Sequence, residues 1–444
     1  MLRKKWFKLT ITNSCVLVAL ALSSATQAEN LLEVYALAYE SDPILKQVVA
    51  QRQATGEGSV QAFARFLPQI SASASSVANN KNKPKTEDND ESYNAHGYSF
   101  DLNQSLFDNE NYVNYRIAKL QINIADANLS AAQQDLIIRT ADAYFLTLAA
   151  VDKVGFTKAE RKAINRQLDQ ATRRYEVGII AITDVHEAQA GYDNANAAVI
   201  SAENDLLIAK ETLRELTGQY IDKVEPLAEK IPLAPPEPAD IQHWVDQALI
   251  SNYTLLAFKE DTSVKKEGIE LQRSGHYPTL GLTASYGYTK FNGPTSFAAA
   301  RSHDGSLGVN VSIPIFEGYA VTSRTHQAQY NFQQSQEAYN QIHNTTEKNA
   351  RSSYLNVLSE VSRVKALRQA VISNQSALRA TEAGFEVGTR TIVDVLNVQS
   401  ELYRAKQEHS NSRYIYVLNV LRLKQASGEL ERSDIEMVNS WLLK

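Results

Sequence analysis

The sequence has almost no cysteine, and its histidines are not clustered as a metal site would need. Its 444 residues include 1 cysteine, Cys15, which lies at the start of a short apolar segment and so is not placed as a lipoprotein acylation site. If the segment that contains Cys15 is removed on export, the mature chain has no cysteine and can form no disulfide. The 8 histidines are not paired at metal-ligand spacing, and no His-Glu-x-x-His motif occurs. We therefore expect no metal site and no cofactor.

Other signatures of catalysis and of nucleic-acid binding are also missing. There is no Gly-x-x-x-x-Gly-Lys string and no nucleophile elbow. The formal net charge is −5 and the pI is about 6.0, with no basic stripe that would bind nucleic acid. The chain is not expected to be an enzyme or to have a nucleic-acid partner.

The N-terminus predicts export. A basic segment precedes the apolar run 15–22, and Thr26-Gln-Ala28 resembles a cleavage site, so residues 1–28 are predicted to be a signal peptide. A membrane anchor is the alternative, but this run is well below the ~20 residues that a spanning helix needs. No later stretch of the sequence is long and apolar enough for a transmembrane helix.

Proline is absent from two long parts of the chain. None lies between Pro84 and Pro226, and none follows Pro314. Because proline costs about 3 kcal/mol inside a helix, these parts are predicted to be helical. Two helices, over 109–177 and 319–386, would each be roughly 100 Å long, which implies coiled-coil packing.

Shorter helices are predicted in pairs. They cover about 31–66, 182–217, 239–275 and 392–427, and each would be roughly 50 Å long. Two short helices laid end to end would match one long helix, which predicts a helical layer of uniform height.

The chain is internally duplicated. Residues 173–218 align without a gap with residues 383–428, which lie 210 positions further on. Copies of about 200 residues are too long for a solenoid repeat, so they indicate two halves of one structure. The predicted division has five parts: the signal peptide, a first repeat over 29–225, a Pro-rich linker over 226–238, a second repeat over 239–430 and a C-terminal tail over 431–444.

Four segments alternate between apolar and polar residues with period two. They lie at about 69–78, 98–107, 279–289 and 306–315. Each has the length of a tilted transmembrane strand, although a soluble antiparallel sheet with one wet face would show the same alternation. The signal peptide and the polar loop 79–91 favour the membrane. Four strands cannot close a barrel in lipid, so a trimer with twelve strands is expected.

Several residue strings resemble one family. They are Leu-Pro-Gln at 67–69, Gln-Ser-Leu-Phe-Asp at 104–108, Val-Gly-Ile-Ile-Ala-Ile-Thr-Asp-Val at 177–185 and Val-Gly-Thr-Arg-Thr-Ile-Val-Asp-Val at 387–395. Over about residues 29–430 the chain closely resembles the TolC family of outer-membrane exit ducts of Gram-negative bacteria.

This resemblance implies an α+β fold. A homotrimer would form a twelve-stranded β-barrel in outer-membrane lipid, four strands from each protomer, joined to a long α-helical coiled-coil barrel in the periplasm. The linker 226–238 and the tail would contribute to an equatorial band. The duct would be passive and would serve tripartite efflux or type I secretion of drugs, small molecules or proteins. Its partners would be a periplasmic adaptor (membrane fusion) protein and an inner-membrane pump of the RND, ABC or MFS type.

The two Val-Gly strings mark turns between a long and a short helix. Gly178 and Gly388 fit the left-handed position after a helix C-terminus. Asp184 lies near the start of the next helix, where a short polar side chain acts as an N-cap. The resemblance implies that these turns form the periplasmic entrance and dock the adaptor.

The resemblance also implies roles for side chains at the entrance. Thr183, Asp184 and Arg390 would form a bonding network within and between protomers. Asp394 would project into the pore, and three copies would make an acidic ring, a common device for cation preference.

Two positions depart from the family pattern. Phe385 stands where the pattern has tyrosine, and Asn397 stands where it has a second pore aspartate. We expect an entrance that is less tightly locked and less cation-selective. A periplasmic coiled-coil adaptor or structural protein is the rival interpretation of the long helices, but it has no need for apolar strand faces.

Overall fold

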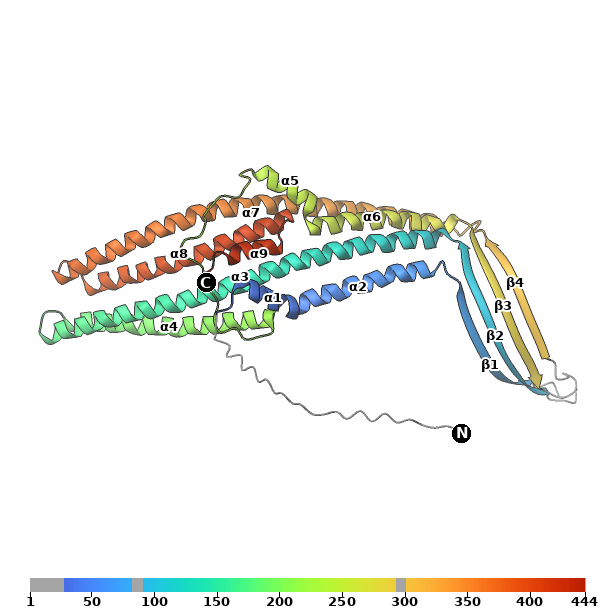
Figure 1. Ribbon diagram of the computed structural model, residues 1–444, viewed down its shortest axis with the longest axis horizontal. Coiled ribbons are helices and arrows are strands. Elements are labelled where there is room, and N and C mark those ends of the chain that lie inside the picture. Colours follow the sequence, from blue (N-terminus) through green and yellow to red (C-terminus); the bar gives the residue numbers. More distant parts are fainter. Residues whose placement is uncertain (1–27, 82–90, 293–300, 444) are drawn as a thin grey trace, which may run out of the picture.

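The computed structural model describes residues 28–81, 91–292 and 301–443. Within them the molecule is elongated, with helices over most of its length and a sheet at one end (Figure 1). The predicted signal peptide, apart from Ala28, and the charged centre of the predicted 79–91 loop lie outside the described residues. None of the described helices is long and apolar enough to cross a bilayer.

The two long helices are present as predicted. Helix α3 (Asn109–Glu176) has 68 residues and α7 (Ala320–Glu386) has 67, so each is roughly 100 Å long. Helix α4 (Ile182–Thr217) runs back along α3, and α8 (Ile392–Ser427) runs back along α7 (Figure 1). The result is two helical hairpins whose turns lie at the end of the molecule opposite the sheet.

The other two predicted helices are each broken in two, so the prediction of continuous helices over 31–66 and 239–275 is wrong. The first comprises α1 (Leu31–Ser41) and α2 (Pro43–Ala64), and the second α5 (Ile241–Ser251) and α6 (Tyr253–Arg273). At each break a residue in extended or other non-helical conformation, Asp42 or Asn252, caps the next helix with its side chain. An acceptor at the N-cap satisfies a free N–H and so stabilises a new helix start.

The sheet contains the four predicted strands in the order β1-β2-β3-β4, all antiparallel. They are β1 (Gln69–Lys81), β2 (Glu91–Phe107), β3 (Thr279–Asn292) and β4 (Arg301–Ser312). Strand β4 ends before Ile313 and Ile315, which the alternation had placed in it, because Pro314 between them has no N–H for the ladder. Strands β2 and β3 come from different repeats, so the central pairing joins the two halves.

The main hydrophobic core lies near the middle of the helical part. Tyr144 and Phe145 of α3 are fully buried there, and Tyr144 Oη donates to the Glu225 carbonyl at 2.8 Å. Tyr416 Oη donates to the carbonyl of Pro232 at 3.0 Å. The proline-rich segment is thus held against the helices by buried tyrosines.

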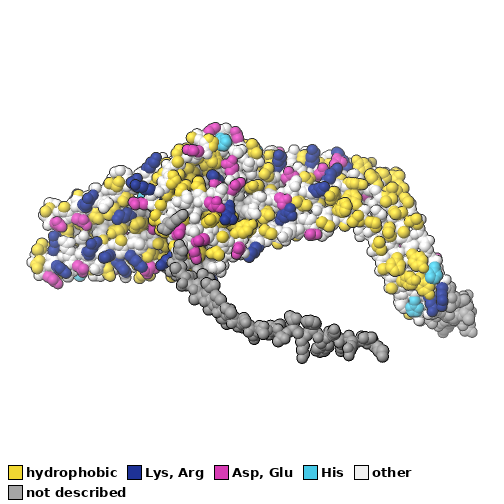
Figure 2. All heavy atoms as spheres, viewed as in Figure 1, with side chains coloured by type: hydrophobic (Ala, Val, Ile, Leu, Met, Phe, Trp, Pro, Cys, Tyr) yellow, Lys and Arg dark blue, Asp and Glu magenta, His cyan; other side chains and the backbone are white. Residues whose placement is uncertain are grey.

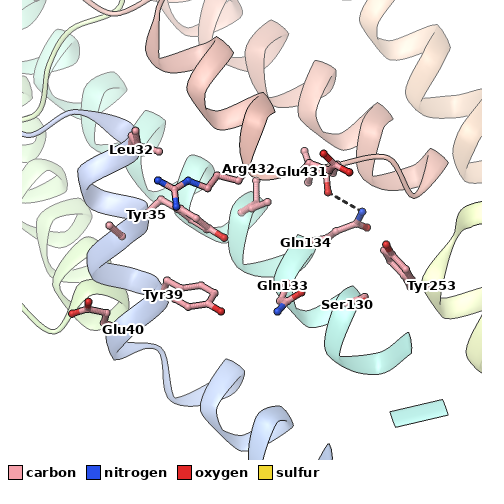
Figure 3. Close-up of a pocket in the computed structure, with 13 residues that line it drawn as sticks. Leu32, Tyr35, Tyr39, Glu40, Ser130, Gln133, Gln134, Tyr253, Glu431 and Arg432 are labelled. Atoms are coloured by element: carbon pink, nitrogen blue, oxygen red, sulfur yellow. Dashed lines mark hydrogen bonds between the residues drawn. The ribbon is translucent and has the colours of Figure 1, made fainter. Parts of the chain in front are cut away.

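The C-terminal tail packs in the same band. Helix α9 (Arg432–Asn439) follows a turn whose Leu430 carbonyl accepts from Gln134 Nε2 at 3.0 Å. Figure 3 shows Tyr35 and Tyr39 of α1, Gln134 of α3 and Arg432 of α9 among the residues that line an open pocket. Because α1, α3 and α9 meet here, the first and the last of the described helices are both held at the middle of the long helix.

Candidate functional site

The closed ends of the two hairpins have the same backbone geometry. Gly178 has φ 79° and Gly388 has φ 78°, the left-handed conformation expected of both. The N–H of Ile179 donates to the Arg174 carbonyl at 2.9 Å, and that of Thr389 to the Gly384 carbonyl at 2.8 Å. These 6→1 bonds define a Schellman motif at each turn. A role for Gly178 and Gly388 in docking stays a prediction.

The starts of the two returning helices differ, and the N-cap interpretation of Asp184 is wrong. Ala181 occupies the N-cap position of α4 and makes no side-chain cap, while Asp184 lies in the first helical turn. Its carboxylate is there favourably placed against the positive end of the helix dipole, which explains the residue without a capping bond.

In α8 the cap is a reciprocal pair. Thr391 Oγ1 accepts from the Asp394 N–H at 3.2 Å, and Asp394 Oδ2 accepts from the Thr391 N–H at 2.9 Å. The hydrogen bond from the Thr391 backbone is the main reason that the pKa of Asp394 is lowered, and the charge of Arg390 adds to it. Asp394 therefore keeps its negative charge at neutral pH, which an acidic ring would require.

The predicted network among Thr183, Asp184 and Arg390 is not formed inside one protomer. In the described part of the chain these three side chains share no hydrogen bond or ion pair. Thr183 and Arg390 are exposed, and Asp184 is half-buried. Contacts between protomers through these residues stay a prediction.

Phe385 is the most buried of the predicted site residues. It is 6% exposed and packs against Ala171, Ala188, Ile392 and Val395, so residues from both hairpins surround it. Asn397 is exposed and lies three residues after Asp394, which puts the two on the same face of α8. That this face lines a pore stays a prediction.

Arg174 is a residue of this site that sequence reasoning missed. Its guanidinium carbon lies 4.8 Å from the centre of the Phe385 ring, and Nη1 donates to the Phe385 carbonyl at 3.4 Å. Arg174 lies in the last turn of the long helix of the first repeat and Phe385 in that of the second, so this contact joins the two hairpins. No signal for this contact was available in the sequence, because the duplication pairs Arg174 with Gly384 and Tyr175 with Phe385.

Gly384 explains how the second turn closes. A Cβ atom at this position would lie 2.8 Å from Cγ of Arg390 and 3.2 Å from Oγ1 of Thr389. A real Cβ does not approach a carbon atom that closely, so a larger residue would push Arg390 away from the turn.

The sequence pattern of the family described as "Outer membrane efflux protein" matches residues 34–219 and 244–429. The chain belongs to this family. The TolC resemblance, the duplicated α+β fold and the outer-membrane location extending into the periplasm are thereby confirmed. The chain is an outer-membrane efflux channel, a transporter and not an enzyme, and the rival interpretation as a periplasmic adaptor is set aside.

Individual members of the family are similar over nearly the whole chain. The outer membrane protein TolC of Escherichia coli is 39% identical over 97% of this chain and 89% of its own length. The alkaline protease secretion protein AprF of Pseudomonas aeruginosa is 28% identical over 93% of this chain and 87% of its own. The crystal structure of the Campylobacter jejuni CmeC outer membrane channel superposes with a TM-score of 0.77 at 16% identity, covering 99% of this chain and 98% of that one.

Proposed function

We propose that three copies of the chain assemble into a continuous duct through the outer membrane and the periplasm. The observation that carries this proposal is the open sheet. Within one described protomer β1 and β4 each pair on one side only, so both outer edges have free N–H and C=O groups. Lipid does not tolerate such edges, and three copies of a four-stranded sheet give a closed barrel of twelve strands.

The helical part supports the same assembly. Ile200, Leu207 and Ile208 of α4 are 63%, 58% and 58% exposed in one protomer. Their spacing of seven and eight residues forms an apolar stripe of the kind that a neighbouring helix covers in a coiled coil. Burial of this stripe between protomers would close the helices into a tube that continues the barrel.

We propose the predicted domain division for the mature duct. The signal peptide 1–28 is removed, the repeats 29–225 and 239–430 form barrel and tube, and the linker 226–238 and tail 431–444 form the equatorial band. The family match to 34–219 and 244–429 supports the two repeats. The hydrogen bond from Leu443 N–H to the Pro226 carbonyl, at 2.8 Å, supports a band in which linker and tail pack together.

The hairpin turns are the proposed periplasmic entrance. Gly178 and Gly388 would let an adaptor protein approach closely, and an inner-membrane pump of the RND, ABC or MFS type would supply the energy. Thr183, Asp184 and Arg390 would bond between protomers when the entrance is closed. Asp394, with a lowered pKa, would form a ring of three carboxylates in the assembled trimer.

The cargo is tested in cells that lack the chain. Accumulation of ethidium is compared among the wild type, the deletion strain and the deletion strain with the gene restored. Higher accumulation in the deletion strain, reversed by the intact gene, would place the duct in efflux of small molecules. Restored genes with altered tip residues would then show whether the entrance limits that efflux.

Secretion of proteins is the second candidate function. It is favoured by the similarity to AprF, a protein named for secretion of an alkaline protease, along 93% of this chain. If ethidium accumulation is unchanged, the proteins secreted by the two strains are compared. Loss of a secreted protein in the deletion strain would assign the duct to type I secretion.

A further inference from the structure

The sheet has one apolar and one polar face. Because paired residues of neighbouring strands point to the same side, the strand register assigns each side chain to a face. The apolar face includes Ile70, Phe100, Leu307 and Val309, which are 72%, 51%, 77% and 63% exposed. In the proposed duct this face meets lipid, and the following inference rests on that proposal.

At the end of the sheet farthest from the helices, the apolar face carries basic side chains. His96 is paired with Lys290, and Lys290 is paired with Arg301, so the three form one line across β2, β3 and β4. His303 lies two residues nearer the helices on the same face, paired with Tyr288. We call His96, Lys290, Arg301 and His303 the basic row. Figure 2 shows histidine and basic side chains gathered at the far end of the sheet, beyond the hydrophobic ones.

Within the described strands the basic row has no counter-ion on its own face. On this face of the sheet the described strands carry no Asp or Glu at all. Asp101 and Asp304 lie on the opposite, polar face, where Ser99 and Ser302 donate to them at 2.8 and 2.5 Å. Among the described residues neither Lys290 nor Arg301 forms an ion pair. The two signs of charge are therefore separated by face.

Aromatic rings fix the depth of the basic row. Tyr98 and Tyr288 lie beside it with ring centres 5.3 Å apart, and the His303 ring centre is 4.9 Å from that of Tyr288. Aromatic belts of membrane barrels lie at the level of the lipid headgroups. His303 lies at the depth of these rings, and His96, Lys290 and Arg301 lie one step further from the helices, about 7 Å along the strand. The basic row is therefore in the headgroup region.

We propose that the basic row binds phosphate groups of lipids in the outer leaflet of the outer membrane. Arginine offers a planar fork of donors that matches two phosphate oxygens, and lysine adds a point charge with three donors. Neighbouring strands are about 4.8 Å apart, so Lys290 and Arg301 can hold one phosphate between them. The Nδ1 atoms of His96 and His303 lie 2.9 Å from Ser76 Oγ and 3.1 Å from Tyr286 Oη. Each imidazole thus has its Nε2 available for the lipid.

The probe is lipid A with both phosphates, compared with lipid A from which both have been removed. Retention of each lipid by the purified full-length protein is measured by native mass spectrometry. The variant Lys290→Gln/Arg301→Gln is compared with Lys46→Gln/Lys266→Gln, which removes two exposed positive charges from α2 and α6. The wild type and this control should prefer the phosphorylated lipid. The basic-row variant should lose about tenfold of that preference, the equivalent of one charge-assisted hydrogen bond.

Two outcomes would overturn the proposal. One is equal retention of both lipids by the wild type, and the other is equal preference in the basic-row variant and the control. Should the double variant not fold, Lys290→Arg/Arg301→Lys keeps both charges and must retain the preference, while Arg301→Gln alone must weaken it. Single-channel conductance of the same samples tests the duct separately. A wild type that conducts but shows no lipid preference would refute only the lipid inference.

Discussion

Removing the Arg174 side-chain contact should loosen the entrance of the duct. Arg174→Met keeps most of the aliphatic stem but removes the charge above the Phe385 ring and the donor to the Phe385 carbonyl. A cation–π contact contributes about 0.5–2 kcal/mol. The hydrogen bond of 3.4 Å is long, so we assign it the lower limit of about 0.5 kcal/mol.

The sum of about 1–2.5 kcal/mol corresponds to a factor of roughly 5–70 in the ratio of closed to open entrances. Three protomers that open together would multiply this factor. Single-channel recording in planar bilayers should therefore show a higher conductance or longer open times for Arg174→Met than for the wild type. Cells that carry the variant should admit more of a large antibiotic such as vancomycin.

The neighbouring Arg173 supplies the matched control. It is exposed, and Arg173→Met removes the same charge one residue away without touching Phe385. Phe385→Leu tests the other half of the contact, and a double-mutant cycle with Arg174→Met isolates their coupling. Equal conductance in Arg173→Met and Arg174→Met, or additive effects in the cycle, would refute the reasoning.

Three further predictions concern the glycines that follow α4 and α8, the ion pair between Asp42 and Arg139 of α3, and the pore. Gly428→Ala should lower the Tm far more than Gly218→Ala. Both residues have positive φ, but the new Cβ would lie 2.3 Å from the Ser251 carbonyl oxygen in Gly428→Ala and 3.3 Å from Ser41 Cβ in Gly218→Ala. We expect Gly218→Ala to lose about 1–2 kcal/mol of stability through the left-handed backbone, and Gly428→Ala to lose about 1–3 kcal/mol more through the clash. The pKa of Asp42 is lowered from 3.8 chiefly by Arg139, so the stabilisation of the fold by this ion pair is present above about pH 4 and is lost as the pH falls through the folded-state pKa. Asp42→Asn should cost about 2 kcal/mol of stability at pH 7, less than for a fully buried pair because Arg139 keeps its contact with Asp135. The variant should also flatten the acid side of the stability curve measured by chemical denaturation. Asn397→Asp should increase cation selectivity, read from reversal potentials in a salt gradient, and unchanged reversal potentials would show that the face of α8 with Asp394 does not line the pore.

The broad fold could be predicted from local patterns because each pattern has a direct physical cause. Proline-free stretches located α3 and α7, and two-residue alternation located the strands. The breaks at Asp42 and Asn252 were missed because a capping side chain inside a helical stretch is compatible with both a continuous and a broken helix. Only tertiary packing decides between the two.

The residues of the candidate site were also only partly predictable from the sequence. Gly178 and Gly388 could be placed from sequence because a left-handed backbone has a strong residue preference. The contact between Arg174 and Phe385 could not be predicted from sequence, because contacts between residues 211 positions apart depend on how the hairpins pack. For Asp184 the local rule for N-caps failed, since the helix starts one turn earlier, after Ala181.

The pairing of β2 with β3 determines when the membrane-spanning part can form. Asn94 pairs with Asn292 and Phe107 with Leu280, so the central seam joins residues separated by well over a hundred positions. Each repeat alone supplies one hairpin, which is marginal in stability by itself. Local helices form fast, whereas distant strand pairing is slow. A newly exported chain should therefore hold its coiled coils before its strands, and a chain cut after the first repeat should stay in the periplasm.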